Sequence, residues 1–403
     1  MSAPPDQKQP ESRAASLAAC FRSSLWLGLT SFGGPVAHIG YFERAYVQRL
    51  RWLDAAAFAQ IAALCQVLPG PASSQMNFLI GWRRGGALGA LLSFTAFTLP
   101  SALLMVAAAA YAGALGGMDT LVQALKLVAA VIVAQAVLSM ARTLCPDLAR
   151  RILAAICAVI CALSGGLYIQ LGVIALGGVF GLLRRPRSDA VPETAGSLPP
   201  MIAQKTAWRA LVLFVLLLAA LPAFAALTGQ QGVLPLAEVF YRSGALVFGG
   251  GHVVLPLLYD ALPAARDNIV LFYGLAQALP GPMFAIASAL GYTLFSPAPW
   301  AGAFVALGFI FLPGLLIAVA GYYFWQKMLA MPRLLAALSG ISAAVVGILA
   351  GALIDPVLIS AIRTLPDALF ILACFALAVW KKLPAAAVIV LCAAYAFLMG
   401  VWA

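Results

Sequence analysis

The chain carries the hexapeptide QVLPGP at residues 66–71 and a near copy, QALPGP, at residues 277–282. Two shorter motifs recur in the same order, namely FGG (32–34 and 248–250) and Leu-Pro followed by a small residue (99–101 and 312–314). The members of these three pairs are 211, 216 and 213 residues apart. Collinear matches at nearly constant spacing predict two homologous halves.

The amino-acid composition is that of a membrane protein. Of 403 residues, 64% are hydrophobic and 9% are charged, whereas a soluble domain carries about 25% charged residues. Several apolar runs approach or exceed the roughly 20 residues that a membrane-spanning helix needs, within 88–111, 121–140, 210–227, 300–321 and 334–354. A membrane β-barrel would instead show alternating segments of about ten residues. We therefore predict an all-α polytopic membrane protein embedded in a lipid bilayer.

The basic residues indicate how the two halves are oriented. The formal net charge is +11, but the charges are scattered through loops, which argues against nucleic-acid binding. Cytoplasmic loops collect Lys and Arg, and an anion pathway would add more. The loops around residues 66–71 contain several arginines, whereas the matching loops of the second half contain Arg266 alone. Equivalent loops should therefore face opposite sides, which predicts inverted-topology repeats.

The same reasoning divides the chain into five segments. We predict a disordered cytoplasmic tail (1–15), a first repeat (16–183), a cytoplasmic linker (184–207), an inter-repeat transmembrane helix (208–230) and a second repeat (231–403). The tail lacks a basic region followed by an apolar run and a cleavage site, so we expect no cleavable signal peptide. A lone spanning helix between the repeats would turn the second copy over.

The first hexapeptide interrupts an apolar stretch that is too short to span. Residues 54–68 would form a helix of about 22 Å, shorter than a hydrocarbon core of about 30 Å, and residues 71–82 are fewer still. Arginines flank both outer ends, so both ends should lie on one side. We predict a re-entrant hairpin whose tip, residues 69–71, lies at membrane depth. The alternative is a Pro-Gly-Pro kink in two long helices that serves packing.

Such a tip would bind an anion. The amides that follow Pro71 begin a helix, where they have no intrahelical acceptor and carry a partial positive charge. Two inverted hairpins would aim two such helix starts at one central site. The predicted substrate-binding residues are Pro69, Gly70, Pro71, Ala72, Ser73 and Ser74 in the first half and Pro280, Gly281, Pro282, Met283 and Phe284 in the second half.

The FGG motifs form a second pair of candidate elements. Their glycines predict either helix breaks or close helix packing, at Phe32, Gly33, Gly34, Phe248, Gly249, Gly250 and Gly251. Four titratable or charged residues near these motifs are candidates for a coupling or charge site, namely His38, Glu43, Arg44 and His252. The histidines do not align between the halves, and a structural hydrogen-bonding role or a hydrated loop is the alternative for each.

The sequence offers little support for a metal, a cofactor or enzymatic chemistry. All seven cysteines lie in or beside apolar stretches, where we expect them to pack as small hydrophobes. The sequence contains no phosphate-binding loop, so ATP hydrolysis is not expected, and it contains no His-Glu-x-x-His motif. We therefore expect a protein that is not an enzyme, with no metal and no cofactor.

The ordered set of motifs resembles the chromate ion transporter family in its long, two-domain form. The resemblance rests on FGGPVAHIGYF (32–42), QVLPGP (66–71), FGGGH (248–252) and the second Pro-Gly-Pro (280–282). It implies two homologous domains of opposite topology and chromate efflux across the bacterial inner membrane, which gives chromate resistance. Residues 267–270 depart from the family pattern, because a motif closer to residues 52–54 is expected there.

From this resemblance we predict a secondary active transporter that exports chromate. Its driving force would be the proton gradient or a counter-transported anion, and the sequence does not choose between them. Sulfate is the related oxyanion, and because both ions are tetrahedral dianions, a sulfate or other oxyanion transporter acting in uptake or exchange is the alternative. The oligomeric state stays open, a homodimer included.

Overall fold

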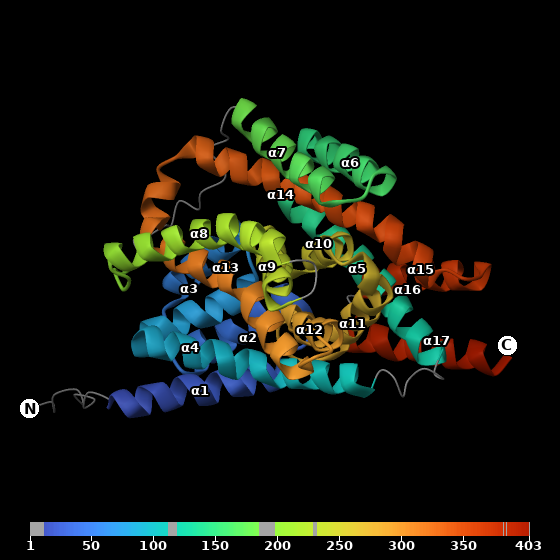
Figure 1. The fold of residues 1–403 in the computed structure, drawn as a ribbon, viewed down its shortest axis with the longest axis horizontal. Helices are drawn as coiled ribbons and strands as arrows, with labels where there is room; N and C mark the ends of the chain where they lie inside the picture. Colours follow the sequence, from blue (N-terminus) through green and yellow to red (C-terminus); the bar gives the residue numbers. More distant parts are fainter. Residues whose placement is uncertain are drawn as a thin grey trace, which may run out of the picture.

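The structure is a computed structural model that describes residues 12–111, 119–184, 198–228, 232–381, 383 and 385–402, and every regular element in these residues is helical (Figure 1). The elements of the first half are α1 (Arg13–Thr30), α2 (Gly34–Phe42), the π-helix η1 (Glu43–Arg49), α3 (Ala55–Val67), α4 (Ala72–Tyr111), α5 (Asp119–Leu144), α6 (Leu148–Leu163) and α7 (Leu167–Leu183). A connecting helix follows, α8 (Gln204–Thr228).

The second half repeats this order with more short turns. Its elements are α9 (Val233–Ala245), η3 (Gly251–Val253), α10 (Val254–Ala261), η4 (Pro263–Ala265), α11 (Arg266–Ala278), η5 (Met283–Ala285), α12 (Ile286–Leu294), α13 (Pro299–Leu329), α14 (Pro332–Ala352), η6 (Leu353–Leu358), α15 (Ile359–Ala361), α16 (Leu365–Lys381) and α17 (Ala385–Trp402).

Five helices of the described residues are long and apolar enough to cross a membrane, namely Ala72–Tyr111, Thr120–Leu144, Gln204–Leu227, Pro299–Leu329 and Pro332–Ala361. Large apolar side chains are exposed on the outer helices, for example on α6, α7, α16 and α17. Exposed apolar surfaces of this extent are typical of proteins that contact a membrane or another protein. The prediction of an all-α polytopic membrane protein is confirmed.

Equivalent helices pack in the same way in the two halves. Helix α1 packs against α4, and α9 packs against α13. Gly28 in α1 lies so close to the Phe97 carbonyl that a Cβ would not fit, and Gly244 in α9 meets the Ile310 carbonyl in the same way. These two contacts are related by the offsets of the sequence repeat, 216 and 213 residues. The repeat read from the sequence is therefore also a structural repeat.

The two halves exchange their last helices. Helices α6 and α7 of the first half pack against α14 of the second half, and α16 and α17 of the second half pack against α5 of the first half (Figure 1). Contacts that are reciprocal in this way are what a two-fold relation between the halves produces. The exchange gives an extended interface, and the larger buried core contains residues of both halves.

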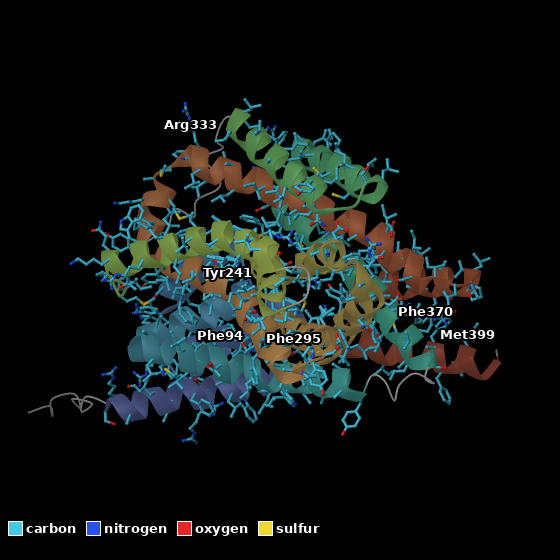
Figure 2. All side chains as sticks on the ribbon, in the orientation of Figure 1. Phe94, Tyr241, Phe295, Arg333, Phe370 and Met399 are labelled. Atoms are coloured by element: carbon cyan, nitrogen blue, oxygen red, sulfur yellow. The ribbon has the colours of Figure 1, made fainter. Side chains whose placement is uncertain are left out.

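Aromatic side chains fill the middle of this interface. Phe94 of α4 meets Phe311 of α13 edge to face, with ring centroids 5.0 Å apart. Phe311 also contacts Phe284 in the middle of the η5 turn, with ring centroids 5.5 Å apart. Figure 2 shows Phe94 near the centre of the molecule and Met399 at its periphery. The η5 turn, which directly follows the second hexapeptide, thus packs into the core that joins the halves.

Helix α4 is two helices joined at a kink. Gly85 and Gly86 have non-helical backbone angles, with φ of −134° and 64°. The first segment therefore ends near Arg84, and the second corresponds to α13. Helix α3 ends at Val67 and α4 begins at Ala72, so residues 68–71 are a true helix break. With 13 residues, α3 is about 20 Å long, too short to cross a bilayer. The placement of this pair as a re-entrant hairpin remains a prediction.

Two helix boundaries differ from the sequence-based segments. Helix α1 begins at Arg13, inside the predicted tail (1–15), because the Ser12 side chain accepts a hydrogen bond from the Ala15 amide at 3.2 Å and caps the helix. Helix α8 begins at Gln204, inside the predicted linker (184–207), because the helix includes polar residues that precede its apolar run. Residues 1–11 of the tail and 185–197 of the linker lie outside the described residues.

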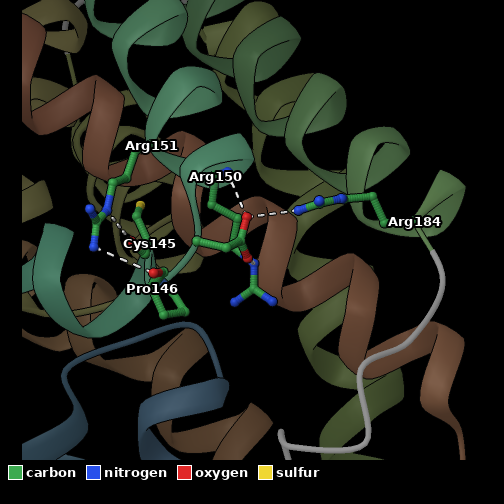
Figure 3. Close-up of polar contacts among 6 residues, drawn as sticks. Cys145, Pro146, Arg150, Arg151 and Arg184 are labelled. Atoms are coloured by element: carbon green, nitrogen blue, oxygen red, sulfur yellow. Dashed lines mark hydrogen bonds and ion pairs between the residues drawn. The ribbon is translucent and has the colours of Figure 1, made fainter.

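A charged corner joins α5, α6 and α7 (Figure 3). Asp147 caps α6 by accepting from the Arg150 amide at 3.0 Å, and it forms ion pairs with Arg150 at 3.1 Å and Arg184 at 2.8 Å. Arg151 donates to the carbonyl oxygens of Cys145 at 3.0 Å and Pro146 at 3.4 Å. These contacts fix the end of α7 beside the start of α6.

Candidate substrate-binding site

Each Pro-Gly-Pro tip is hydrogen-bonded to the opposite half. The Gly70 amide donates to the Val247 carbonyl at 2.7 Å, and the Gly281 amide donates to the Ser31 carbonyl at 2.9 Å. Ser31 and Val247 are equivalent, since each immediately precedes an FGG motif. The two hydrogen bonds are therefore equivalent contacts, one from each half. Each tip thus meets the segment just before the FGG motif of the other half, although the two are far apart along the chain.

The third repeated motif, residues 99–101 and 312–314, also contacts the tips where the halves cross. Gly314 lies against Gly70, where a Cβ added to Gly70 would be 2.7 Å from the Gly314 Cα. Its equivalent, Ser101, lies against Gly281, where an added Cβ would be 2.8 Å from the Ser101 Oγ. Gln75 strengthens the first crossing, because its Nε2 donates to the carbonyls of Pro69 and Gly314, each at 2.8 Å.

Sequence reasoning noticed the repeat of residues 99–101 and 312–314 but gave it no role in the site. Its recurrence was the available signal. Gln75 was also missed, and its only signal was a polar side chain inside an apolar stretch. Both omissions have one cause, since a spacing along the chain does not reveal which segments of opposite halves touch.

Both tip glycines have backbones that other residues rarely adopt. The φ angle is 118° at Gly70 and 100° at Gly281, in the left-handed region where an L side chain is strained. The close neighbours described above leave no space for a side chain either. Glycine is therefore required at these two positions for both conformation and space.

The first tip leads directly into a helix. The Gln75 amide donates to the Pro71 carbonyl at 3.0 Å, so this is the first turn of α4 and the amides of Ala72, Ser73 and Ser74 precede the intrahelical ladder. The side chains of Ser73 and Ser74 are both buried. The Ser74 Oγ has no hydrogen-bond partner among the described residues. An unpaired buried hydroxyl beside free amides is an arrangement that a polar ligand would satisfy.

The second tip enters its helix through a 3₁₀ turn. Residues Met283–Ala285 form η5, in which the Ala285 amide donates to the Pro282 carbonyl at 3.0 Å, and α12 begins only at Ile286. Met283 and Phe284 are buried, and the Gln277 Nε2 lies 3.2 Å from the Met283 Sδ. This helix start is therefore more apolar than the first, and the two contributions to a central site are unequal.

Both histidines lie where the halves cross. The His38 Nε2 is 3.2 Å from the Ser31 carbonyl, which also accepts from Gly281. Among the described residues, the His38 Nδ1 and the Ser31 Oγ have no partner. The His252 Nδ1 is 2.7 Å from the Tyr273 hydroxyl, and a Cβ added to Gly34 would lie 3.8 Å from the His252 Nε2. The structure thus brings the two histidines to the FGG motif of the first half.

The remaining candidate residues lie further out. Glu43 and Arg44 are exposed on η1, and Arg44 donates to the Gly40 carbonyl at 3.3 Å and covers the Tyr41 ring. Phe32 and Gly33 are exposed, whereas Phe248 to Gly250 are half-buried and Gly251 is buried. In the described part of the chain, no group of three or more His, Cys, Asp and Glu side chains could hold a metal ion.

A buried polar network holds the first segment of α4. The Asn77 Oδ1 accepts from the Tyr46 hydroxyl at 2.6 Å and from the Ser24 Oγ at 3.2 Å. The Asn77 Nδ2 donates to the Ser93 carbonyl at 2.8 Å. This network joins α1, η1 and both segments of α4, and it positions the helix that carries Ser73 and Ser74. Sequence reasoning missed it, because its members are far apart along the chain.

Known proteins share this chain's organisation. A family model described as chromate transporter matches residues 18–182 and again residues 234–397. A chromate transport protein of Pseudomonas aeruginosa is 29% identical over 354 residues, which covers 85% of this chain and 82% of that protein. One of Cupriavidus metallidurans is 28% identical, covering 82% and 80%, and a probable chromate transport protein of Synechococcus elongatus is 27% identical, covering 85% and 84%.

No solved structure matches the chain. The family model matches twice, once in each half, and together the two matches cover most of the sequence. The resemblance stated from the motifs is confirmed, and this chain belongs to the chromate transporter family.

Proposed function

We propose that this protein is a secondary active transporter that exports chromate from the bacterial cytoplasm across the inner membrane and thereby gives chromate resistance. The substrate is supported by the family and by three relatives that are named for chromate transport. The direction and the energy source are our inference from the sequence and the site. The relatives are transport proteins, which supports transport rather than catalysis.

The observation that carries this proposal is the reciprocal docking of the two tips. Gly70 and Gly281 each bond to the other half, which supports our proposal that the helix starts after them serve one substrate site. Helix starts aimed at anionic groups of a substrate from broken helices are a common transporter arrangement. A tetrahedral dianion such as chromate would take hydrogen bonds from amides and from the Ser74 hydroxyl.

The composition of the site suits an ion that must be released again. The tip residues 69–74 and 280–284 contain no Lys or Arg, so binding would rest on neutral donors and partial charges. Neutral donors avoid the strong ion pairs that a fixed cation would form in a low-dielectric interior. His38 and His252 are our candidates for the coupling site, because both lie at the crossing.

Chromate accumulation in intact cells tests the proposal. Cells that express the protein should accumulate less chromate than cells that express a Gly70→Val variant at the same membrane level, and an uncoupler should abolish the difference. Excess sulfate should reduce export if the two dianions share the site. Equal or higher accumulation with the intact protein would rule out export and would direct attention to uptake or to another anion.

A further inference from the structure

The charged corner around Asp147 carries more positive charge than its carboxylate balances. Arg150 and Arg184 both pair with Asp147, at 3.1 Å and 2.8 Å, and Arg151 donates to two backbone carbonyl groups of the same turn. Figure 3 shows the three arginines at this corner, with Arg151 on the left and Arg184 on the right. Three guanidinium groups and one carboxylate leave two formal positive charges.

These arginines keep hydrogen-bond donors for a ligand. A guanidinium has five N–H groups. The Nε of Arg150 and one Nη of Arg184 face Asp147, while Arg151 uses its Nε and one Nη on the carbonyl groups. These contacts leave N–H groups on all three side chains, and Arg151 and Arg184 are exposed. Because the side chains are already held in place, they can receive an anionic group at little further cost in entropy.

An apolar stripe begins at the same corner. Helix α6 buries one face, with Ala154 and Cys157 against Gly347 of α14. Its opposite face is apolar over the whole helix, and five residues spaced three or four apart each have 49% or more of their surface exposed, namely Leu148, Ile152, Ile156, Val159 and Leu163. Leu148 directly follows Asp147, so the stripe starts beside the arginines.

Helix α7 extends the apolar surface. Leu176, Val179 and Leu183 are exposed, and their spacing places them on one face of the helix. Leu183 directly precedes Arg184, so the apolar face of α7 also reaches the corner. Figure 1 shows α6 and α7 at the edge of the molecule. The surface therefore combines a cationic end with two apolar faces that run away from it.

The corner should lie at the level of the cytoplasmic headgroups. It leads into the basic linker (184–207), and cytoplasmic segments collect arginine. With 16 residues, α6 is about 24 Å long, shorter than a hydrocarbon core of about 30 Å. Arginines at the start of so short a helix reach the interface, where anionic lipids attract basic clusters.

We propose that the Asp147 corner binds the headgroup of an anionic phospholipid whose acyl chains lie along the exposed faces of α6 and α7. The two unbalanced charges suit a lipid with two phosphate groups, such as cardiolipin, and guanidinium groups bind phosphate oxygens well. This proposal does not rest on the chromate function, because it concerns different residues and a different ligand.

Charge favours lipid over a second copy of this chain as the occupant. A two-fold dimer through α6 and α7 would use the same surface on both copies. It would bring two corners of like charge to one interface, which opposes association. An anionic lipid instead supplies the charge that the corner lacks.

Thermal unfolding of the purified full chain in detergent tests the lipid site. Cardiolipin should raise the unfolding midpoint in a saturable way, since a ligand that binds only the folded state stabilises it, and added NaCl should weaken the effect. Zwitterionic phosphatidylcholine should have little effect, because it lacks the net charge. Inorganic phosphate should also have little effect, because it has no acyl chains to cover the stripe.

The half-saturating cardiolipin concentration should rise about fivefold in Arg151→Gln and in Arg184→Gln, each compared with its own lipid-free midpoint. Arg151→Gln leaves the Asp147 ion pairs in place, so it should fold even if Arg184→Gln does not. Arg49→Gln is the matched control, because Arg49 is an exposed arginine of η1 in a loop expected on the same side, and it should respond as the unchanged protein does.

Three results would overturn the site. Equal stabilisation by phosphatidylcholine would remove the role of charge, and equal stabilisation by inorganic phosphate would indicate a soluble anion as the ligand. An unchanged response in both corner variants, or the same loss in Arg49→Gln, would show that cardiolipin acts elsewhere or on surface charge in general. None of these results bears on chromate export, which is measured separately.

Discussion

Gly70 packs against the Gly314 backbone and Gly281 against the Ser101 side chain, and their positive φ angles add a conformational reason for glycine. A β-branched residue at either position should abolish chromate transport while membrane expression stays largely intact. The added Cβ would displace Gly314 or Ser101, and the left-handed backbone would be strained by about 1–3 kcal/mol. We would measure transport and membrane level of Gly70→Val and Gly281→Val.

Gly308→Val is the control for these variants. Gly308 is an exposed residue of α13, and a Cβ added there meets nothing within 4 Å. This variant should transport normally. Normal transport by both tip variants would show that the crossing is not the substrate site.

Ser74 allows a gentler test of the same site. Its Oγ is buried without a partner among the described residues, so Ser74→Ala should leave thermal stability unchanged or slightly raised, because no hydrogen bond is lost. If the hydroxyl binds the anion, the apparent KM for chromate should rise about fivefold or more, in line with roughly 1 kcal/mol or more for a hydrogen bond to a charged group. Ser23→Ala, which removes a hydroxyl bonded to its own helix, serves as control.

At the scale of secondary structure, Asp147 joins the start of α6 to the end of α7. Asp147→Ala removes the cap of α6 and both ion pairs, and it should lower the free energy of unfolding by about 1–2 kcal/mol. Asp147→Asn keeps a capping oxygen but loses the charge, so its effect should be smaller. Thermal unfolding in detergent measures both, and equal stability of Asp147→Ala and the unchanged protein would contradict the structural role.

The charge of Asp147 also predicts a dependence on pH. Burial raises the pKa of this carboxyl, but hydrogen bonds and charge from Arg150 and Arg184 outweigh burial and hold the pKa below its usual value. A carboxyl with a lowered pKa stabilises the fold above its unfolded pKa of about 4 and loses this effect as pH falls through the folded pKa. The stability difference between the unchanged protein and Asp147→Asn should therefore shrink in that acidic range.

At the scale of the whole molecule, the two-fold relation and the loop charges together imply inverted halves. The turn after the first tip should be cytoplasmic and the turn after the second tip extracytoplasmic. Ala87 and Ser296 are exposed residues in these two turns, and the native cysteines are buried or, for Cys161, half-buried. An impermeant maleimide added to intact cells should label Ser296→Cys and should label Ala87→Cys only after lysis.

Labelling of both positions from the same side would contradict the inversion while leaving the observed two-fold packing in place. The reason is that a two-fold axis along the membrane normal also relates two halves, as in parallel repeats. The experiment therefore decides the direction of the axis, which the packing alone does not.

The sequence by itself determined the helical class, the membrane environment, the two repeats and the family. Composition and apolar run length are local properties, so they can be read without knowing what touches what. The helix break at each Pro-Gly-Pro also followed from local chemistry, since proline cannot donate and ends a helix. Candidate anion-binding residues followed from the same local argument.

Only the tertiary structure decided which segments meet. The bonds from Gly70 to Val247 and from Gly281 to Ser31, the exchange of the last helices, and the ion pair from Asp147 to Arg184 all join residues that are distant along the chain. A repeat shows that two segments are equivalent, but it does not reveal whether each packs within its own half or against the other. That choice depends on the shape and burial of the whole interface, which exists only once both halves have folded together.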